Sequence, residues 1–313
     1  MSAIRTEGLA KRFGAVPALE GLDLSVEPGA IFGFLGPNGA GKTTTIRILT
    51  GLARPTGGRA TVAGIDVTRG REGVAQVIGH LPEEPMFYPW MTPREFVDHV
   101  ARLFGLRPAD RAKRVASLLD QVGLGPVADR RIGGFSRGMR QRLGLAQALV
   151  NQPKVLFLDE PVSALDPAGR KEILGLIERL RGQCTVFMSS HILADVERVC
   201  DTVAIVARGR LVTQASRDAL LERYAVPIFE IETDPAATGS LTGWAESLRS
   251  LPWTESTAIE GSMARIVVRD VTVAKQELLP SALAAGLTLT RYQLVRPSLE
   301  DVFLRLVGQD GHQ

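Results

Sequence analysis

The hydrophobic pattern changes along the chain, and each change predicts a kind of element. Residues 19–29 (LEGLDLSVEPG) alternate apolar and polar positions, as a half-buried strand does, and end in a Pro-Gly turn. Residues 30–36 (AIFGFLG) and 154–161 (KVLFLDEP) are mostly apolar at consecutive positions, which predicts short strands buried on both faces. Residues 73–85 (GVAQVIGHLPEEP) predict a strand that runs into a loop.

The pattern becomes helical between Met91 and about Val127. Thr92-Pro93-Arg94-Glu95 has the form of a capping box with proline at the first helical position, and apolar residues then recur at three- and four-residue steps. Arg107-Pro108 interrupts the pattern before a second helix begins. We expect these helices to belong to an insert, about residues 91–150, between strands of an α/β core.

The remaining pattern predicts two domains. Residues 3–26 predict two strands around a tight turn, and residues 154–224 alternate strands with helices, as a parallel sheet covered on both faces does. We therefore expect an α/β domain with a mixed sheet over residues 1–224. The pattern changes after Pro227, and residues 225–313 predict a small α+β accessory domain.

Composition agrees with ordinary globular domains. The 313 residues are 45% hydrophobic and 23% charged, and the net charge of +3 is too small and dispersed to indicate nucleic-acid binding. The sequence shows neither an uninterrupted apolar window near 18 residues nor the apolar centre of a signal peptide, so we expect a cytosolic location. Cys184 and Cys200 are expected to be two buried thiols rather than a disulfide.

A glycine-rich segment, GPNGAGKTT, follows the first buried strand. Gly36, Gly41, Lys42 and Thr43 occupy the fixed places of the pattern G-x-x-x-x-G-K-[ST]. Glycines let backbone N–H groups point at phosphate oxygens, and the helix that follows adds the positive end of its dipole. The lysine of this motif reaches the β- and γ-phosphates, and the hydroxyl ligates Mg²⁺. The alternative, a glycine turn between core elements, becomes the weaker interpretation once the flanking strand and helix are counted.

Two carboxylates, Asp159 and Glu160, end the second buried strand. Alone they would indicate a solvated strand end. Beside a phosphate loop, Asp159 is predicted to hold the Mg²⁺ shell, and Glu160 to polarise a water for in-line attack on the γ-phosphate.

A second anion site is predicted at the start of FSRGMRQRLGLAQAL, where Ser136 and Gly138 lie at a helix N-terminus. Within one rigid sheet, this site and the glycine loop cannot easily contact the same γ-phosphate. Two chains that face each other head to tail can bring the two sites together, because the second site of each chain then contacts the nucleotide bound by the other. The alternative is an ordinary N-cap.

This order of motifs resembles the ATP-binding cassette (ABC) family over about Ala3 to Tyr224. The resemblance implies a P-loop NTPase fold with ATP and Mg²⁺ as cofactors. GPNGAGKT resembles the Walker A loop, VLFLDE the Walker B strand, FSRGM the LSGGQ signature, and Ser163 to Asp166 the D-loop. The implied metal ligands are Thr43 and Asp159. The implied nucleotide contacts are Phe13, Gly36, Pro37, Asn38, Gly39, Ala40, Gly41, Lys42, Thr43, Thr44, Ser136 and Gly138.

The resemblance also implies three catalytic residues. Glu160 matches the Walker B glutamate, His191 matches the switch histidine that contacts the γ-phosphate, and Glu83 stands at the glutamine-loop position. Phe13 falls where the family stacks an aromatic residue on adenine. The alternatives are a helix cap or core residue for His191 and a core residue for Phe13.

Departures from the family pattern add charge at two places. Arg137 replaces the first glycine of the signature, and Glu83 carries a charge that glutamine lacks. Phe135 replaces a leucine, and Phe13 stands where tyrosine is common.

Two further stretches resemble particular parts of transport ATPases within this family. PSLEDVFLRLVG (residues 297–308) is similar to the ending of ATPases that serve ABC-2-type exporters of drugs, sodium or polysaccharide, although a purely structural or dimer-stabilising appendage is the alternative. MFYPWM (residues 86–91) carries three aromatics where, in the family, a short helix of the membrane subunit docks. The alternative for this stretch is packing of the helical insert onto the sheet.

The resemblance implies the ATP-hydrolysing subunit of an ABC exporter. We expect it to act with separate integral membrane permease subunits and with a second copy of itself in an ATP-sandwich homodimer, at the inner face of the cell membrane and without nucleic acid. The alternative is a soluble cassette ATPase acting on nucleic acid or ribosomes, which usually carries two cassettes or a long coiled-coil insert. A small-molecule kinase would not explain residues 136–149 or His191.

Overall fold

The computed structural model describes residues 2–70, 73–163, 165–223, 227–234, 238–295 and 298–308. The chain divides into two compact units, Met1–Arg217 and Asp218–Gln313. The predicted domain boundary at Tyr224 lies outside the described residues, as do Ala164 of the predicted D-loop and Pro297 before the last helix.

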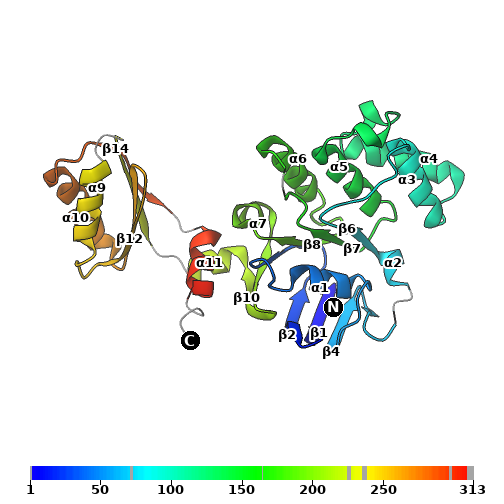
Figure 1. The fold of residues 1–313 in the computed structure, drawn as a ribbon, viewed down its shortest axis with the longest axis horizontal. Coiled ribbons are helices and arrows are strands. Elements are labelled where there is room, and N and C mark those ends of the chain that lie inside the picture. Colours follow the sequence, from blue (N-terminus) through cyan, green and yellow to red (C-terminus); the bar gives the residue numbers. More distant parts are fainter. Residues whose placement is uncertain are drawn as a thin grey trace. The chain divides into compact units, whose positions relative to one another are not determined.

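A six-stranded sheet forms the centre of the first unit (Figure 1), with strand order β10-β9-β3-β8-β7-β6. The pairs from β9 to β6 are parallel and only β10 runs antiparallel, which confirms the parallel sheet expected from the alternation of strands and helices. Every residue of β3, β7 and β8 is buried, and for β3 and β7 this confirms the buried strands that their apolar runs predict. The strands are β3 (Ile31–Leu35), β6 (Ile78–Leu81), β7 (Val155–Asp159), β8 (Thr185–Ser190), β9 (Thr202–Ala207) and β10 (Arg210–Ser216).

A second, antiparallel sheet packs against this one through a shared core. Leu22, Leu24 and Val26 are buried in it, so the predicted alternation holds. Across the interface lies a cluster of phenylalanines in which the ring of Phe187 is 5.2 Å from that of Phe32 and 5.6 Å from that of Phe157. The order is β2-β1-β4-β5, with β1 (Ile4–Phe13), β2 (Val16–Val26), β4 (Gly57–Val62) and β5 (Ile65–Asp66).

Helices cover the six-stranded sheet. Figure 1 shows α5 and α6 on the side of the sheet away from β1, β2 and β4. Helix α1 begins directly after the glycine-rich loop and buries Ile46 and Leu49 in the core shared by the two sheets. The helices are α1 (Lys42–Leu49), α5 (Arg137–Ala148), α6 (Pro167–Glu178) and α7 (Leu193–Val199).

The predicted helical insert is present. Both hydrogen bonds of the capping box form, because Thr92 Oγ1 accepts from Glu95 N at 3.2 Å and Glu95 Oε2 accepts from Thr92 N at 2.8 Å. The predicted range, about residues 91–150, contains α3 (Pro93–Leu103), α4 (Pro108–Gln121), the short 3₁₀ helices η1 (Gly125–Val127) and η2 (Ile132–Gly134), and α5.

One predicted strand is wrong at its start. Residues 74–77 form a single helical turn, α2 (Val74–Val77), and β6 begins only at Ile78. The apolar run here is too short for its period to separate helix from strand. Gly73 enters the turn at φ +80°, a conformation that favours glycine.

The second unit has the predicted α+β composition. Its antiparallel sheet has the order β12-β13-β11-β14, and the core between this sheet and its helices includes Phe229, Trp244 and Leu278. The elements are α8 (Arg217–Arg223), β11 (Ile228–Thr233), α9 (Thr238–Leu248), β12 (Thr254–Glu260), β13 (Met263–Val268), α10 (Val271–Ala284), β14 (Leu289–Val295) and α11 (Leu299–Gly308).

Two further expectations concern thiols and membrane helices. Cys184 and Cys200 are free and buried, and burial raises the pKa of Cys184 to about 11 and that of Cys200 further. Within the described ranges, we find no helix with the length and apolarity needed to cross a bilayer.

Candidate active site

The glycine-rich loop lies between β3 and α1, where the positive end of the helix faces the loop. Lys42 Nζ donates to the carbonyl of Gly36 at 2.7 Å and to that of Pro37 at 3.3 Å. A Cβ on Gly36 would approach Val206 O to 2.5 Å, and one on Gly41 would approach Ala18 O to 2.6 Å. Both positions therefore require glycine, because these clashing atoms belong to the backbone and cannot move aside as the end of a flexible side chain could.

Asp159 lies at the carboxyl end of β7, beside the first turn of α1. Its Oδ1 accepts from Ser189 Oγ at 2.6 Å and from Thr43 Oγ1 at 3.4 Å. The hydroxyl and the carboxylate are hard oxygen donors on adjacent elements, so they fit an Mg²⁺ ion that takes its other ligands from phosphate and water. Among the described residues, no group of three or more acidic, His or Cys side chains could hold a metal on its own.

Glu160 follows at once and is nearly buried, with a left-handed φ of +48°. Its Oε1 is 3.3 Å from Lys42 Nζ, and its Oε2 is 2.8 Å from His191 Nδ1. This contact joins the imidazole of His191 directly to the carboxylate of Glu160. Ser189 Oγ also accepts from the backbone N–H of Glu160 at 3.0 Å, which links the two acidic residues through one hydroxyl.

A cavity of about 270 Å³ brings most of the predicted residues together. Its walls include Glu83, Glu160 and His191, so the residues predicted to be catalytic share one space with the loop. Gly36 and Asp159 adjoin this space through their bonds to Lys42 and Thr43. The other lining residues are Ala18, Pro37, Asn38, Gly39, Ala40, Gly41, Lys42, Thr43 and Thr44.

Phe13, Ser136 and Gly138 do not line this cavity. Phe13 is 57% exposed at the end of β1, with the ammonium of Lys11 4.9 Å from its ring centre, so it is not a core residue. Ser136 is the N-cap of α5, and its Oγ accepts from Met139 N at 3.3 Å. The capping alternative is thus realised, and the serine hydroxyl keeps acceptor capacity for a second contact.

Sequence reasoning missed two polar residues of this site. Gln141 is 1% exposed on α5, and its Nε2 donates to Pro161 O at 3.1 Å and to Glu83 O at 3.4 Å. Ser189 is fully buried between the two acidic residues. Two features of the sequence could have indicated these residues: Gln141 lies on the apolar face of a helix, and Ser189 lies at the end of an apolar strand. A polar side chain at a buried position needs a hydrogen-bond partner, so both positions suggest a polar contact inside the protein.

The stretch after Glu83 is partly packed and partly exposed. Phe87 meets Phe96 of α3 edge to face at 5.1 Å, which is the packing alternative for this ring. Met86 and Trp90 are 86% and 66% exposed, so they leave a large apolar surface uncovered.

Comparison with known proteins identifies the family. The ABC transporter family matches residues 19–163, and the C-terminal domain of DrrA1-3-like ATP-binding proteins matches residues 216–307. The ABC transporter ATP-binding protein YxlF of Bacillus subtilis is 38% identical over 96% of this chain and 98% of its own length. This chain is an ABC transporter ATP-binding protein.

Other relatives agree with that assignment. The daunorubicin resistance ATP-binding protein DrrA2 of Streptomyces coeruleorubidus is 36% identical over 98% of this chain and 95% of its own length. A solved ATP-binding subunit of an ABC transporter superposes with a TM-score of 0.65 and 28% identity, over 71% of this chain and 93% of its own. The P-loop NTPase cassette fold and the ABC-2-type exporter resemblance are therefore confirmed.

The ABC ATP-binding protein is an ATPase whose nucleotide binding and hydrolysis are coupled to transport. The alternative of a soluble cassette acting on nucleic acid or ribosomes is not favoured, because the similarity to transport ATPases extends over nearly the whole chain.

Proposed function

We propose that Glu160 is the general base of ATP hydrolysis in this exporter subunit. The supporting observation is its carboxylate, nearly buried beside the phosphate loop and in contact with both Lys42 and His191. The carboxylate takes a proton from water as the water oxygen bonds to the γ-phosphorus, and the bond from that phosphorus to the β–γ bridging oxygen breaks to give ADP and phosphate. His191 orients the acceptor oxygen, and Glu83 lines the same cavity.

The remaining contacts of this proposal follow from the loop. Residues 36–44 bind the phosphates with backbone N–H groups and Lys42, and Phe13 stacks on adenine. Thr43 and Asp159 hold Mg²⁺, which when bound neutralises charge on the β- and γ-phosphates. A γ-phosphate would attract Lys42 away from Glu160, so nucleotide binding frees the carboxylate to accept a proton.

The proposal extends to a homodimer. Ser136 and Gly138 lie outside the cavity formed by their own chain, and a Cβ on Gly138 would meet only the side chain of Leu165, at 4.0 Å. This open helix start suits the γ-phosphate bound by a second copy facing head to tail. Arg137 adds a positive charge beside that phosphate.

The proposal also includes integral membrane permease subunits as binding partners. The exposed side chains of Met86, Tyr88 and Trp90 form an apolar surface that suits a partner helix. Such a partner would hold the ATPase at the inner face of the cell membrane. Residues 1–224 act in this proposal as the nucleotide-binding domain and residues 225–313 as the accessory domain.

A single substitution, Glu160→Gln, tests the assignment of the base. The variant is expected to bind ATP normally, to hydrolyse it at least about 100-fold more slowly and to accumulate ATP-bound dimers, because only proton acceptance is lost. Phosphate release and size-exclusion chromatography with ATP measure these effects. Glu84→Gln is the matched control, since Glu84 is exposed and outside the cavity. Unchanged turnover in Glu160→Gln would reject this role.

A further inference from the structure

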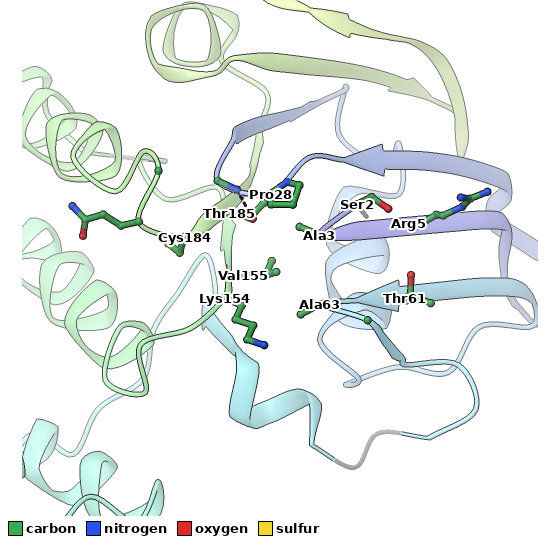
Figure 2. Close-up of a pocket in the computed structure, with 14 residues that line it drawn as sticks. Ser2, Ala3, Arg5, Pro28, Thr61, Ala63, Lys154, Val155, Cys184 and Thr185 are labelled. Carbon is green, nitrogen blue, oxygen red and sulfur yellow. Dashed lines mark hydrogen bonds between the residues drawn. The ribbon is translucent and has the colours of Figure 1, made fainter.

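A larger cavity, of about 660 Å³, lies in the first unit among the starts of the central strands. Residues just before or at the beginning of β3, β7 and β8 line it, together with the start of β1 and the β4–β5 turn (Figure 2). These strands carry the nucleotide site at their opposite, carboxyl ends, so the two cavities share none of their lining residues. The lining residues are Ser2, Ala3, Arg5, Pro28, Gly29, Thr61, Ala63, Gly64, Lys154, Val155, Gly182, Gln183, Cys184 and Thr185.

The walls of this cavity are mainly apolar. Pro28, Ala63 and Ala3 contribute aliphatic surface, and Cys184 adds a thiol whose pKa is raised by burial to about 11, so it is neutral at pH 7. The hydroxyl of Thr185 is engaged, since it accepts from the backbone N–H of Gly29 at 3.0 Å. A volume between about 300 and 1,000 Å³ with apolar walls and few polar groups is typical of a small-molecule site.

The charge of the cavity is one-sided. Two of its lining residues are basic and none is acidic. Arg5 is already paired with Glu7 at 2.8 Å, and Figure 2 shows its guanidinium directed away from Lys154. The exposed Lys154 side chain lines the cavity from just before β7, and Figure 2 shows it on the side where Ala63 lies. This ammonium is the cationic group available to a ligand in the cavity.

We propose that this cavity binds a small amphipathic organic anion, with one carboxylate or sulfonate on an aromatic or aliphatic body. The body packs against Ala3, Pro28 and Ala63, and the anionic group pairs with Lys154. Burial of apolar surface supplies most of the affinity, and the lysine selects the anion over a neutral molecule of the same shape. Because this cavity is separate from the phosphate loop, ATP and the anion bind at the same time.

The test is equilibrium binding of 8-anilinonaphthalene-1-sulfonate, followed by its fluorescence, to the full chain saturated with ATP and Mg²⁺. Saturable binding is expected, and Lys154→Gln is expected to weaken it about threefold, which corresponds to the loss of one ion pair to an exposed lysine. The control is Lys113→Gln, an exposed lysine of α4 outside the cavity, which should leave binding unchanged.

Two comparisons sharpen this test. The neutral analogue N-phenyl-1-naphthylamine should bind wild type and Lys154→Gln with equal affinity, because it has no charge for the lysine to pair with. Ala3→Leu should weaken both probes by filling the cavity, while ATP affinity shows that the first unit is still folded. Displacement of the sulfonate by ATP, or equal sulfonate affinity in Lys154→Gln and Lys113→Gln, would overturn the proposal. Neither result bears on Glu160 as the base, which is tested by ATP turnover.

Discussion

At the scale of single residues, the site depends on two buried polar side chains, Ser189 and Gln141, whose hydrogen bonds position the residues around them. Ser189 bonds to Asp159 through its side chain and to Glu160 through that residue's backbone, so one hydroxyl aligns the proposed metal ligand with the proposed base. Gln141 similarly connects two loops, because its amide nitrogen donates to Glu83 O and Pro161 O. Both residues are buried, and neither was expected from motif spacing.

Replacement of Gln141 by leucine tests this connection. The change leaves the buried carbonyl of Pro161 without its donor, and it should lower the free energy of unfolding by about 1–3 kcal/mol. We also expect ATP turnover to fall about tenfold with little change in ATP affinity, since the positions of Glu83 and Glu160 are loosened while the phosphate loop is untouched. Urea denaturation and steady-state ATPase assays measure the two effects.

Gln147 offers a matched control on the same helix. It is only partly buried on α5 and lies outside the nucleotide cavity, so Gln147→Leu should be nearly neutral in both assays. Equal stability and turnover in the two leucine variants would show that the Gln141 bridge does not matter.

At the scale of elements, an ion pair connects helices α3 and α4 of the insert. Asp98 of α3 pairs with Arg102 one turn later at 2.7 Å and with Arg111 of α4. Burial by itself would raise the pKa of Asp98, but hydrogen bonds from Arg111 and Arg102 outweigh it, and the pKa is lowered from 3.8. The ionised carboxylate therefore stabilises the folded insert.

The pH dependence follows from the direction of that shift. The stabilisation is fully present above the ordinary pKa of 3.8 and is lost as pH falls through the lowered pKa of the folded state. Asp98→Asn should cost about 1 kcal/mol of unfolding free energy at pH 7, and the difference from wild type should persist at pH 5 and shrink below pH 4. Urea midpoints across this range measure it.

Asp110 provides the comparison for Asp98. Among the described residues its ion pair is with Arg107, at 3.7 Å, and its side chain is 68% exposed, so Asp110→Asn should change stability little at any of these pH values. A cost for Asp98→Asn that grew toward low pH would contradict the stated sign.

At the scale of the whole molecule, the ABC ATP-binding protein combines a nucleotide cassette with a second compact α+β unit. In the first unit, Met86, Tyr88 and Trp90 expose large apolar side chains within five consecutive residues. Tyr88 and Trp90 rings lie 5.2 Å apart, so they present one continuous aromatic face to a partner.

Trp90→Ala is expected to leave ATP binding intact and to weaken association with the permease by about 2 kcal/mol, because an interfacial tryptophan is a typical anchor. The measurement is the amount of membrane subunit that co-purifies from detergent extracts. Val16→Ala serves as the control, since Val16 is also 66% exposed but lies in the antiparallel sheet. Equal recovery of the permease in both variants would favour simple packing of the insert.

What the sequence by itself determined was local. The spacing within residues 36–44 specified a phosphate loop, since phosphate binding needs glycines and a lysine a few residues apart. The capping box at Thr92 specified a helix start, since its two hydrogen bonds need side chains three residues apart. Continuous apolar runs determined β3 and β7, whose every residue is buried. The helical turn at α2 was missed because four residues carry too little periodicity.

Only the tertiary structure decided which distant groups meet. Glu160 and His191 are 31 residues apart in the chain and 2.8 Å apart in space, because β7 and β8 are neighbours whose carboxyl ends share one edge of the sheet. The same pairing places Ser189 against Asp159, and the packing of α5 directs Gln141 to Pro161. Chain spacing cannot supply these contacts, since strand order and helix packing are set by burial of the whole core. The cavity at Lys154 likewise exists only because the starts of separate strands and the β4–β5 turn surround one space.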